Sequence, residues 1–313
     1  MAEVPFQEVA PDMQWIGVDG GGTKTTFGLF DNNLNLLREL RLPTCHIGQV
    51  GREGMREVLS RGIRELLVIS QGEIGVGLGL AGYGQDPFLR RQIEEVTMEV
   101  VGGLPFELMS DVRAAWAASL NGRDGVTVVC GTGSIAYAVC GARERRAGGW
   151  GCQIGDEGSA WWMGRELVRL FSRQADGRDV RSPLFDVVMD GCALSGPYDI
   201  ISYMRNEVAG DRAKTASLAH LLYEAALLGD ESALMVYRRA ARELADIVEA
   251  AAFGLFEPGE RVLVGCVGGA FGGAGELLTG ELERLLPEGF SVVEPAHCPA
   301  AGPCLLLKRR LVG

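Results

Sequence analysis

The residues best suited to do chemistry stand early in the chain, between residues 15 and 31. Asp19 ends an apolar segment and is followed by three glycines, then by threonine hydroxyls around Lys24, before a second apolar segment begins. Successive glycines allow positive φ and let the backbone approach a ligand closely. The N–H groups of such a turn form a concavity that binds anions, and Asp19 stands where a Mg²⁺ bound to phosphates needs an oxygen ligand. The stretch therefore predicts a β-hairpin whose turn holds phosphate.

An ordinary hairpin turn is the alternative, because Gly-Gly pairs occur in many of them. Such a turn needs only one or two special residues and would leave the carboxylate at the strand end without a role, so we favour phosphate. The order of residues also excludes two commoner phosphate loops. The chain has no G-x-x-x-x-G-K-S/T run and no G-x-G-x-x-G that opens a helix, since these glycines lead into a strand.

The hydrophobic pattern predicts a mixed α/β unit that positions this hairpin. The expected elements are strands at 15–18, 27–30, 34–42, 74–80 and 105–109, a helix from about residue 52 and a helix at 87–101.

The pattern then restarts, because Ser110-Asp111 opens a helix and a second hairpin follows it. The turn of that hairpin, residues 131–134, repeats the glycine and hydroxyl chemistry of the first. The repetition predicts a diverged internal duplication, with two phosphate hairpins facing each other across a cleft; two unrelated tight turns are the alternative. The further expected elements are helices at 112–120 and 161–173, a helical middle of the chain, a helix from about 276 after a glycine-rich turn at 268–273 and a helix near 301–311, with strands at 126–130, 135–140, near 145–150, 262–267 and 290–293.

Composition narrows the class of protein. A length of 313 residues suits two domains, and 47% hydrophobic with 23% charged residues is typical of a globular enzyme. The net charge of −11 argues against nucleic acid as a partner. No apolar run is long enough for a membrane span, and the acidic start lacks the features of a signal peptide, so we expect a cytoplasmic protein that binds no membrane.

The eight cysteines are scattered and form no C-x-x-C pair, which favours reduced thiols in the cytosol. His297, Cys298 and Cys304 could approach a metal ion. We do not expect a structural metal there, because the spacing typical of zinc ligands is absent.

Five motifs in this order resemble a known family. They are D-G-G-G-T-K-T (19–25), S-D-V-R-A-A (110–115), G-T-G-S (131–134), G-G-W-G with G-D-E-G-S (148–159) and V-G-G-A (267–270). The chain resembles the sugar kinase/Hsp70/actin superfamily, and within it the BadF/BadG/BcrA/BcrD-type group that contains N-acetylglucosamine and glucosamine kinases. The resemblance implies an α/β fold of two ribonuclease H-like (actin-like ATPase) domains with an interdomain cleft. The domains would be residues 1–110 with the C-terminal helix 297–313, and residues 111–296. A homodimer is also implied.

The resemblance further implies an ATP-dependent carbohydrate kinase that phosphorylates a hydroxyl of N-acetylglucosamine or glucosamine, at O6. Asp111 would be the general base, and Asp19 would hold Mg²⁺ through water. The residues that would bind ATP are Asp19, Gly20, Gly21, Gly22, Thr23 and Lys24 in the first turn, Gly131, Thr132 and Gly133 in the second, and Gly268 and Gly269 at the adenosine. The sugar contacts would be His46, Gly149, Trp150 and Asp156.

Each of these sites has a plainer alternative. Asp111 could act as a helix N-cap, and Asp156 could cap the helix that begins near Ser159. His46 could lie in a solvated loop. Residue 45 departs from the family, whose N-acetylglucosamine kinases carry Asn-His where this chain has Cys45-His46. A thiol is a poor replacement for an amide that holds sugar hydroxyls, so the substrate could also be another hexose or N-acetylmuramic acid.

Two other classes of function are alternatives to a sugar kinase. An ATP-driven activator of a partner enzyme, of the reductase-activase type, uses cysteines to bridge an iron–sulfur cluster, and no cysteine pair here has that spacing. A sugar-sensing regulator would need a DNA-binding segment, which we do not expect before the first strand of an acidic chain.

Overall fold

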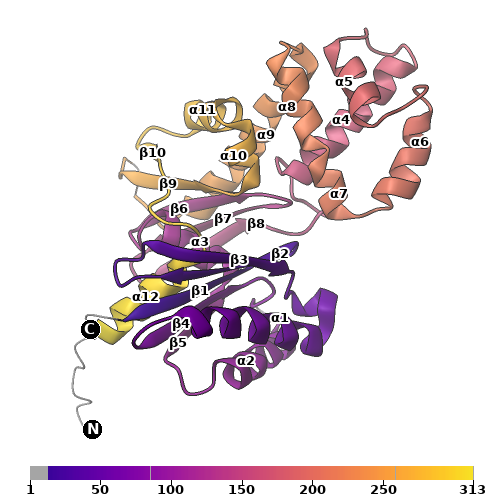
Figure 1. Ribbon diagram of the computed structural model, residues 1–313. Coiled ribbons are helices and arrows are strands. Elements are labelled where there is room, and N and C mark those ends of the chain that lie inside the picture. Colours follow the sequence, from indigo (N-terminus) through magenta and orange to yellow (C-terminus); the bar gives the residue numbers. More distant parts are fainter. Residues whose placement is uncertain (1–12, 85, 258, 313) are drawn as a thin grey trace. The chain divides into compact units, whose positions relative to one another are not determined.

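The computed structural model describes residues 13–84, 86–257 and 259–312 (Figure 1). The chain divides into two compact units. Unit 1 comprises the residues up to Thr127 and those from Glu294 onward, and unit 2 comprises Val128–Val293.

Unit 1 is built on a five-stranded sheet of order β3-β2-β1-β4-β5. Its strands are β1 Gln14–Gly20, β2 Lys24–Phe30, β3 Leu36–Pro43, β4 Ile74–Leu80 and β5 Phe106–Ser110. β1 and β2 form the expected antiparallel hairpin, whereas β1, β4 and β5 run parallel to one another. The carboxyl ends of β1, β4 and β5 therefore lie at one edge of the sheet.

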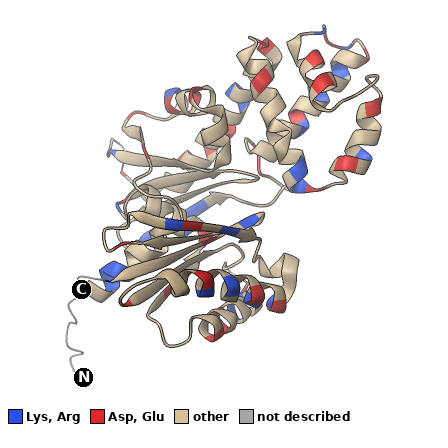
Figure 2. Cartoon of the chain, in the orientation of Figure 1, with Lys and Arg blue, Asp and Glu red and all other residues tan. Residues whose placement is uncertain are grey.

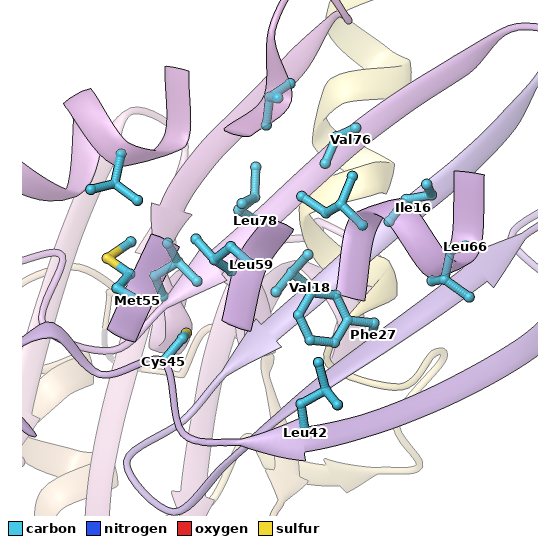
Figure 3. Close-up of a cluster of buried hydrophobic side chains, with 14 of the residues drawn as sticks. Ile16, Val18, Phe27, Leu42, Cys45, Met55, Leu59, Leu66, Val76 and Leu78 are labelled. Atoms are coloured by element: carbon cyan, nitrogen blue, oxygen red, sulfur yellow. The ribbon is translucent and has the colours of Figure 1, made fainter. Parts of the chain in front are cut away.

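Two helices, α1 (Ile47–Ile69) and α2 (Pro87–Val101), cover one face of this sheet. Helical spacing puts the buried residues of α1 on one side, and they meet Val18, Phe27 and Val76 of the strands (Figure 3). Gly62 of α1 gives the Phe27 ring its space, since a Cβ at Gly62 would lie 2.4 Å from Phe27 Cε1. Acidic and basic residues alternate along the outer sides of α1 and α2 (Figure 2), and Arg52 joins the helices through Glu95 and Glu99.

The other face of the sheet carries α3 (Asp111–Ser119) and α12 (Ala301–Val312), which pack against each other and on β4. β4 reads Ile-Gly-Val-Gly-Leu-Gly-Leu, so its alternation sends the aliphatic side chains toward α1 and leaves bare glycines toward α12. A Cβ at Gly77 would lie 2.5 Å from the amide nitrogen of Cys304. Helix α12 thus rests directly on the strand backbone.

Unit 2 repeats this architecture with a sheet of order β10-β9-β6-β7-β8. Its strands are β6 Gly125–Cys130, β7 Ser134–Cys140, β8 Arg143–Gly148, β9 Val262–Val267 and β10 Phe290–Val293. β7 and β8 are antiparallel and β9 and β10 parallel, as in unit 1. Read in chain order, the five strands occupy the same places as β1 to β5, which supports the predicted duplication.

Most helices of unit 2 come between β8 and β9 in the sequence. They are α4 Ala160–Ala175, α5 Pro183–Gly191, α6 Asp199–Tyr203, the π-helix η1 Met204–Val208, α7 Arg212–Ser217, α8 Ala219–Leu227 and α9 Glu231–Ala252, followed after β9 by α10 Gly269–Ala274 and α11 Glu276–Leu285. α9 packs on β7, β8 and α11, and α4 packs on α5, α7 and α8 (Figure 1).

Most expected elements are confirmed, with differences at glycines. The helix expected from residue 52 is preceded by one turn beginning at Ile47, from which it is separated at Gly51 (φ 69°). The glycine-rich turn at 268–273 was wrong as a turn, because the backbone is already helical from Gly269. The expected domain boundary lies before α3, whereas contacts of α3 with α12, β4 and β5 group it with unit 1; where the functional domains divide stays a prediction.

Two further observations concern the described residues only. None of their helices has both the length and the apolar character that crossing a bilayer requires. No three His, Cys, Asp or Glu side chains among them gather as they would around a metal ion.

Candidate active site

Asp19 and Asp111 lie at the same edge of the unit 1 sheet. Asp19 is the second-last residue of β1 and pairs with Gly79 of β4. Asp111 directly follows β5, which pairs with the other side of β4. Two strand spacings, about 10 Å, therefore separate the strands that carry the two carboxylates. The structure thus brings the expected base and the expected Mg²⁺ residue to one place.

The first glycine turn is held in shape from outside. Gly21 N donates to Lys24 O at 3.0 Å and closes the turn. The carbonyl oxygens of Gly21 and Gly22 accept hydrogen bonds from Thr44 Oγ1 (2.8 Å) and Gln49 Nε2 (2.9 Å). Gly22, Thr23 and Lys24 are exposed. An exposed turn with its carbonyls already engaged is preorganised for an anion.

The charged form of the Asp19 carboxyl group is destabilised by its surroundings. Burial raises its pKa from the usual 3.8 to about 6, and the nearby charge of Asp111 acts in the same direction, while Lys24 opposes it. Two carboxylates that raise each other's energy are a setting in which a cation is stabilised, so the donor set fits the expected Mg²⁺.

Asp111 is the first residue of α3, and the capping role is filled by its neighbour. Ser110 Oγ accepts from Arg113 N at 3.3 Å, while Asp111 Oδ1 accepts from Val112 N at 2.9 Å. Since Ser110 caps the helix, capping does not explain the carboxylate at 111.

Cys45 and His46 follow β3 beside this edge. Cys45 is 2% exposed and belongs to the core below α1 (Figure 3). A Cβ at Gly20 would lie 2.8 Å from Cys45 Sγ, so the thiol fills the space under the first turn. The His46 ring lies between Gly48 and Gly82, and its Nδ1 is buried with no hydrogen-bond partner among the described residues.

The second glycine turn is tied to the loop that precedes α4. Gly131 N donates to Gly133 O at 2.9 Å, and Gly131 O accepts from Ala160 N at 3.0 Å. Ser134 Oγ donates to Glu157 O at 2.6 Å. These bonds hold residues 157–160 against the turn.

Asp156 lies beneath this turn and is only 4% exposed. Its carboxylate accepts from Arg212 Nη2 at 2.5 Å and, weakly, from Ser134 N at 3.5 Å. Its φ of 64° is in the left-handed region, where a non-glycine residue is uncommon. The cap of α4 is instead Ser159, whose Oγ accepts from Trp162 N.

Gly149 and Trp150 are at the start of the same loop. Gly149 has a φ of 67°, and its N–H donates to Ser134 O at 2.9 Å. Trp150 is 69% exposed, with the Arg146 guanidinium 5.8 Å from its ring centre. An exposed aromatic face beside glycines is suited to a sugar ring.

The Gly268 backbone lies on β6, because a Cβ there would fall 2.3 Å from Cys130 O. Gly269, Gly272 and Gly273 follow on the exposed side of α10, and no atom of the described residues lies within 4 Å of where their Cβ atoms would be. Helical spacing places these three glycines on one face, a bare strip against which a flat ring can lie. Gly268 and Gly269 were expected at the adenosine. The spacing of residues 269, 272 and 273 is the signal in the sequence that adds Gly272 and Gly273.

Each unit therefore collects its own set of the expected residues. Unit 1 gathers Asp19, the first turn, His46 and Asp111, and unit 2 gathers the second turn, the 149–156 loop and Gly268. Three polar residues in these contacts were not expected from the sequence: Thr44 and Gln49 at the first turn and Arg212 at the second. Nothing in their local sequences points to the turns.

Comparison with known proteins decides the family. The sequence profile of the BadF/BadG/BcrA/BcrD ATPase family matches residues 16–306. The chain belongs to this family. The match to this ATPase family confirms the resemblance seen in the five motifs. It also implies ATP as the nucleotide.

Two relatives of this BadF/BadG family member are sugar kinases. The N-acetylmuramic acid/N-acetylglucosamine kinase of Clostridium acetobutylicum is 29% identical over 263 residues, 81% of this chain and 84% of the relative. The N-acetyl-D-glucosamine kinase of Dictyostelium discoideum is 27% identical over 252 residues, 75% and 77% of the two chains. Carbohydrate kinases thus match most of the chain, which confirms the expected enzyme class.

Solved structures confirm the fold of the family member. A protein of Chromobacterium violaceum, provisionally assigned as an N-acetylglucosamine kinase, matches with a TM-score of 0.71 and 27% identity over 94% of this chain and 98% of that chain. A ROK family glucokinase of Streptomyces griseus, solved with glucose and AMPPNP, matches with a TM-score of 0.60 at 23% identity over 95% and 98%. The predicted α/β actin-like ATPase architecture, with two five-stranded mixed sheets, is correct.

Proposed function

We propose that this protein is an ATP-dependent kinase that phosphorylates an amino sugar, N-acetylglucosamine or glucosamine, at O6. The kinases named above act on such sugars, and the chain aligns with most of their length. The observation that carries the proposal is the placement of Asp19 and Asp111 at one sheet edge, beside a preorganised glycine turn.

ATP fits the residues present. Gly20 to Lys24 and Gly131 to Gly133 are the proposed phosphate-binding turns, and Gly268 with Gly269 begins the bare strip proposed for adenosine. Asp19 would hold Mg²⁺ through water, and the ion would neutralise phosphate charge during transfer.

Asp111 is proposed to accept the proton of the attacking sugar hydroxyl. Phosphoryl transfer depends mainly on positioning and charge neutralisation, with a carboxylate orienting the acceptor. Its place at the first turn of α3, with helix capping assigned to Ser110, supports this role.

His46, Gly149, Trp150 and Asp156 are the proposed sugar contacts. A polar ligand would satisfy the unpartnered Nδ1 of His46, and the exposed Trp150 ring offers a face for a pyranose. Cys45 lies in the core and offers no amide, so the sugar hydroxyls held by the family asparagine need another partner here.

N-acetylmuramic acid is a second candidate acceptor, because one relative is a kinase of both that sugar and N-acetylglucosamine. A screen that couples ADP release to a spectroscopic signal, run over hexoses, hexosamines and their N-acetyl and lactyl derivatives, tests the proposal. We expect turnover with an amino sugar and product phosphorylated at O6 by NMR. ATP hydrolysis that no sugar accelerates would overturn it.

We also propose a cytoplasmic homodimer, as the family resemblance implies. Light scattering on the purified protein checks the assembly, and a mass of one chain, 33.5 kDa, would rule it out.

A further inference from the structure

The Arg212 guanidinium lies directly on the second glycine turn. If Gly133 carried a Cβ, that atom would fall 2.2 Å from Arg212 Nη2 and 3.0 Å from both carboxylate oxygens of Asp156. The absence of a side chain at 133 is therefore what allows the Asp156–Arg212 pair to meet at the turn.

The two partners differ sharply in exposure. Asp156 is buried, whereas 42% of the Arg212 side chain is exposed. A guanidinium carries five N–H donors, and among the described residues Asp156 is its hydrogen-bond partner through Nη2. Arg212 thus keeps donors on its exposed side, in the fork geometry that suits phosphate.

The fold fixes where Arg212 stands. Helix α7 packs on α4 so closely that a Cβ at Gly164 would lie 2.1 Å from Thr215 O. Asp211 begins α7, accepting from Ala213 N at 2.7 Å. Arg212 is about one helical turn before Thr215, so the close contact at Thr215 fixes the backbone from which the Arg212 side chain extends.

The second turn also needs a cation that its own sequence lacks. In the first hairpin Lys24 is the first residue of the strand that follows the turn, β2, whereas the corresponding strand of the second hairpin, β7, begins with Ser134. In a chain with a net charge of −11, a polyanion needs local positive charge. Arg212 supplies it from the helical segment inserted between β8 and β9.

We infer that Arg212 binds the β- or γ-phosphate of the nucleotide at the second glycine turn, and that Asp156 is the positioning residue that holds its guanidinium there. The inference rests on the proposed function and names a residue of the same site. Asp156 then has two tasks, orienting Arg212 through Oδ2 and contacting the sugar.

Nucleotide binding without sugar tests this, with Kd measured calorimetrically for AMP, ADP and ATP. Arg212→Ala should weaken ATP binding roughly 10- to 100-fold, the range for losing hydrogen bonds to a charged group, and leave AMP within about twofold of wild type. Arg212→Lys should fall between. Asp156→Asn should weaken ATP binding too, and combining it with Arg212→Ala should add little. Arg205→Ala removes an exposed charge from the same segment and is the matched control.

Several outcomes would overturn the inference. Equal losses for AMP and ATP would indicate a structural effect. Unchanged nucleotide affinities with a raised KM for sugar alone would assign Arg212 to the acceptor, and thermal unfolding of each variant separates misfolding from both. The measurement needs no acceptor, so failure to phosphorylate any sugar would contradict the proposed function and still leave this result readable.

Discussion

Ala114 of α3 lies against Gly79 of β4 so closely that a Cβ on Gly79 would fall 2.4 Å from the Ala114 Cβ. On its other side, Gly302 of α12 meets the same residue, since a Cβ there would lie 2.0 Å from Ala114 O. Helix α3 is thereby held between two glycines, one helical turn from Asp111. The position of the proposed base follows from backbone contacts that only glycine permits.

Gly79→Ala should displace α3 and with it Asp111. We expect a loss of about 1–3 kcal/mol in the free energy of unfolding, as for other overpacked cores, and a fall in kcat that exceeds any change in KM for ATP. Chemical denaturation and steady-state kinetics measure both. Gly103→Ala is the control, because a Cβ there meets nothing within 4 Å. Normal kcat in Gly79→Ala would show that α3 tolerates movement.

Asp111→Asn should lower kcat by about 10²–10⁴, the usual contribution of a general base, and leave the Kd for ATP nearly unchanged. The neighbouring Ser110→Ala is a matched control. It should cost about 1 kcal/mol of stability through the lost cap but keep most of the turnover. Near-normal turnover in Asp111→Asn would contradict the proposed mechanism.

Asp19→Asn should trade activity for stability. The charge of Asp19 is destabilised first by burial and then by repulsion from Asp111. A neutral amide should therefore raise the free energy of unfolding in EDTA at pH 7.5 by about 1–2 kcal/mol. Magnesium-dependent turnover should be lost at the same time. Thermal melts with and without magnesium make the comparison, and a variant less stable than wild type in EDTA would contradict a destabilised charge at Asp19.

Cys45→Asn should not restore a sugar contact. The side chain is enclosed in the core under Gly20, so a larger amide without partners should cost about 1–3 kcal/mol. Cys45→Ala, which adds no polar group, should be milder. Denaturation curves and KM values for N-acetylglucosamine decide the matter. A stable Cys45→Asn protein with a lower KM would show that residue 45 lines the sugar site after all.

The features that could be predicted from the sequence are those that depend on local interactions. The first hairpin, with Asp19 and Lys24, could be predicted because strand alternation and a glycine turn are local signals. Asp111 could be predicted because Ser110, the residue before it, is a typical N-cap and marks the start of a helix.

The features that could not be predicted from the sequence depend on tertiary structure. Arg212 reaches the second turn because α7 packs on α4, and Cys45 is buried in the core below α1, close to Gly20. Helix α10 was unexpected since glycine is a poor helix former; its buried residues Phe271 and Ala274 stabilise it instead.

Unit 1 is completed by the last helix of the chain. Trp15 of β1 and Phe30 of β2 are covered by Cys304 and Leu307 of α12. While the protein emerges from the ribosome, the first sheet must wait with one apolar face uncovered until residues 301–312 have left the exit tunnel. Folding of this unit therefore requires contacts between segments that are far apart in the sequence, and its partly folded sheet exposes apolar surface that can aggregate until those contacts form.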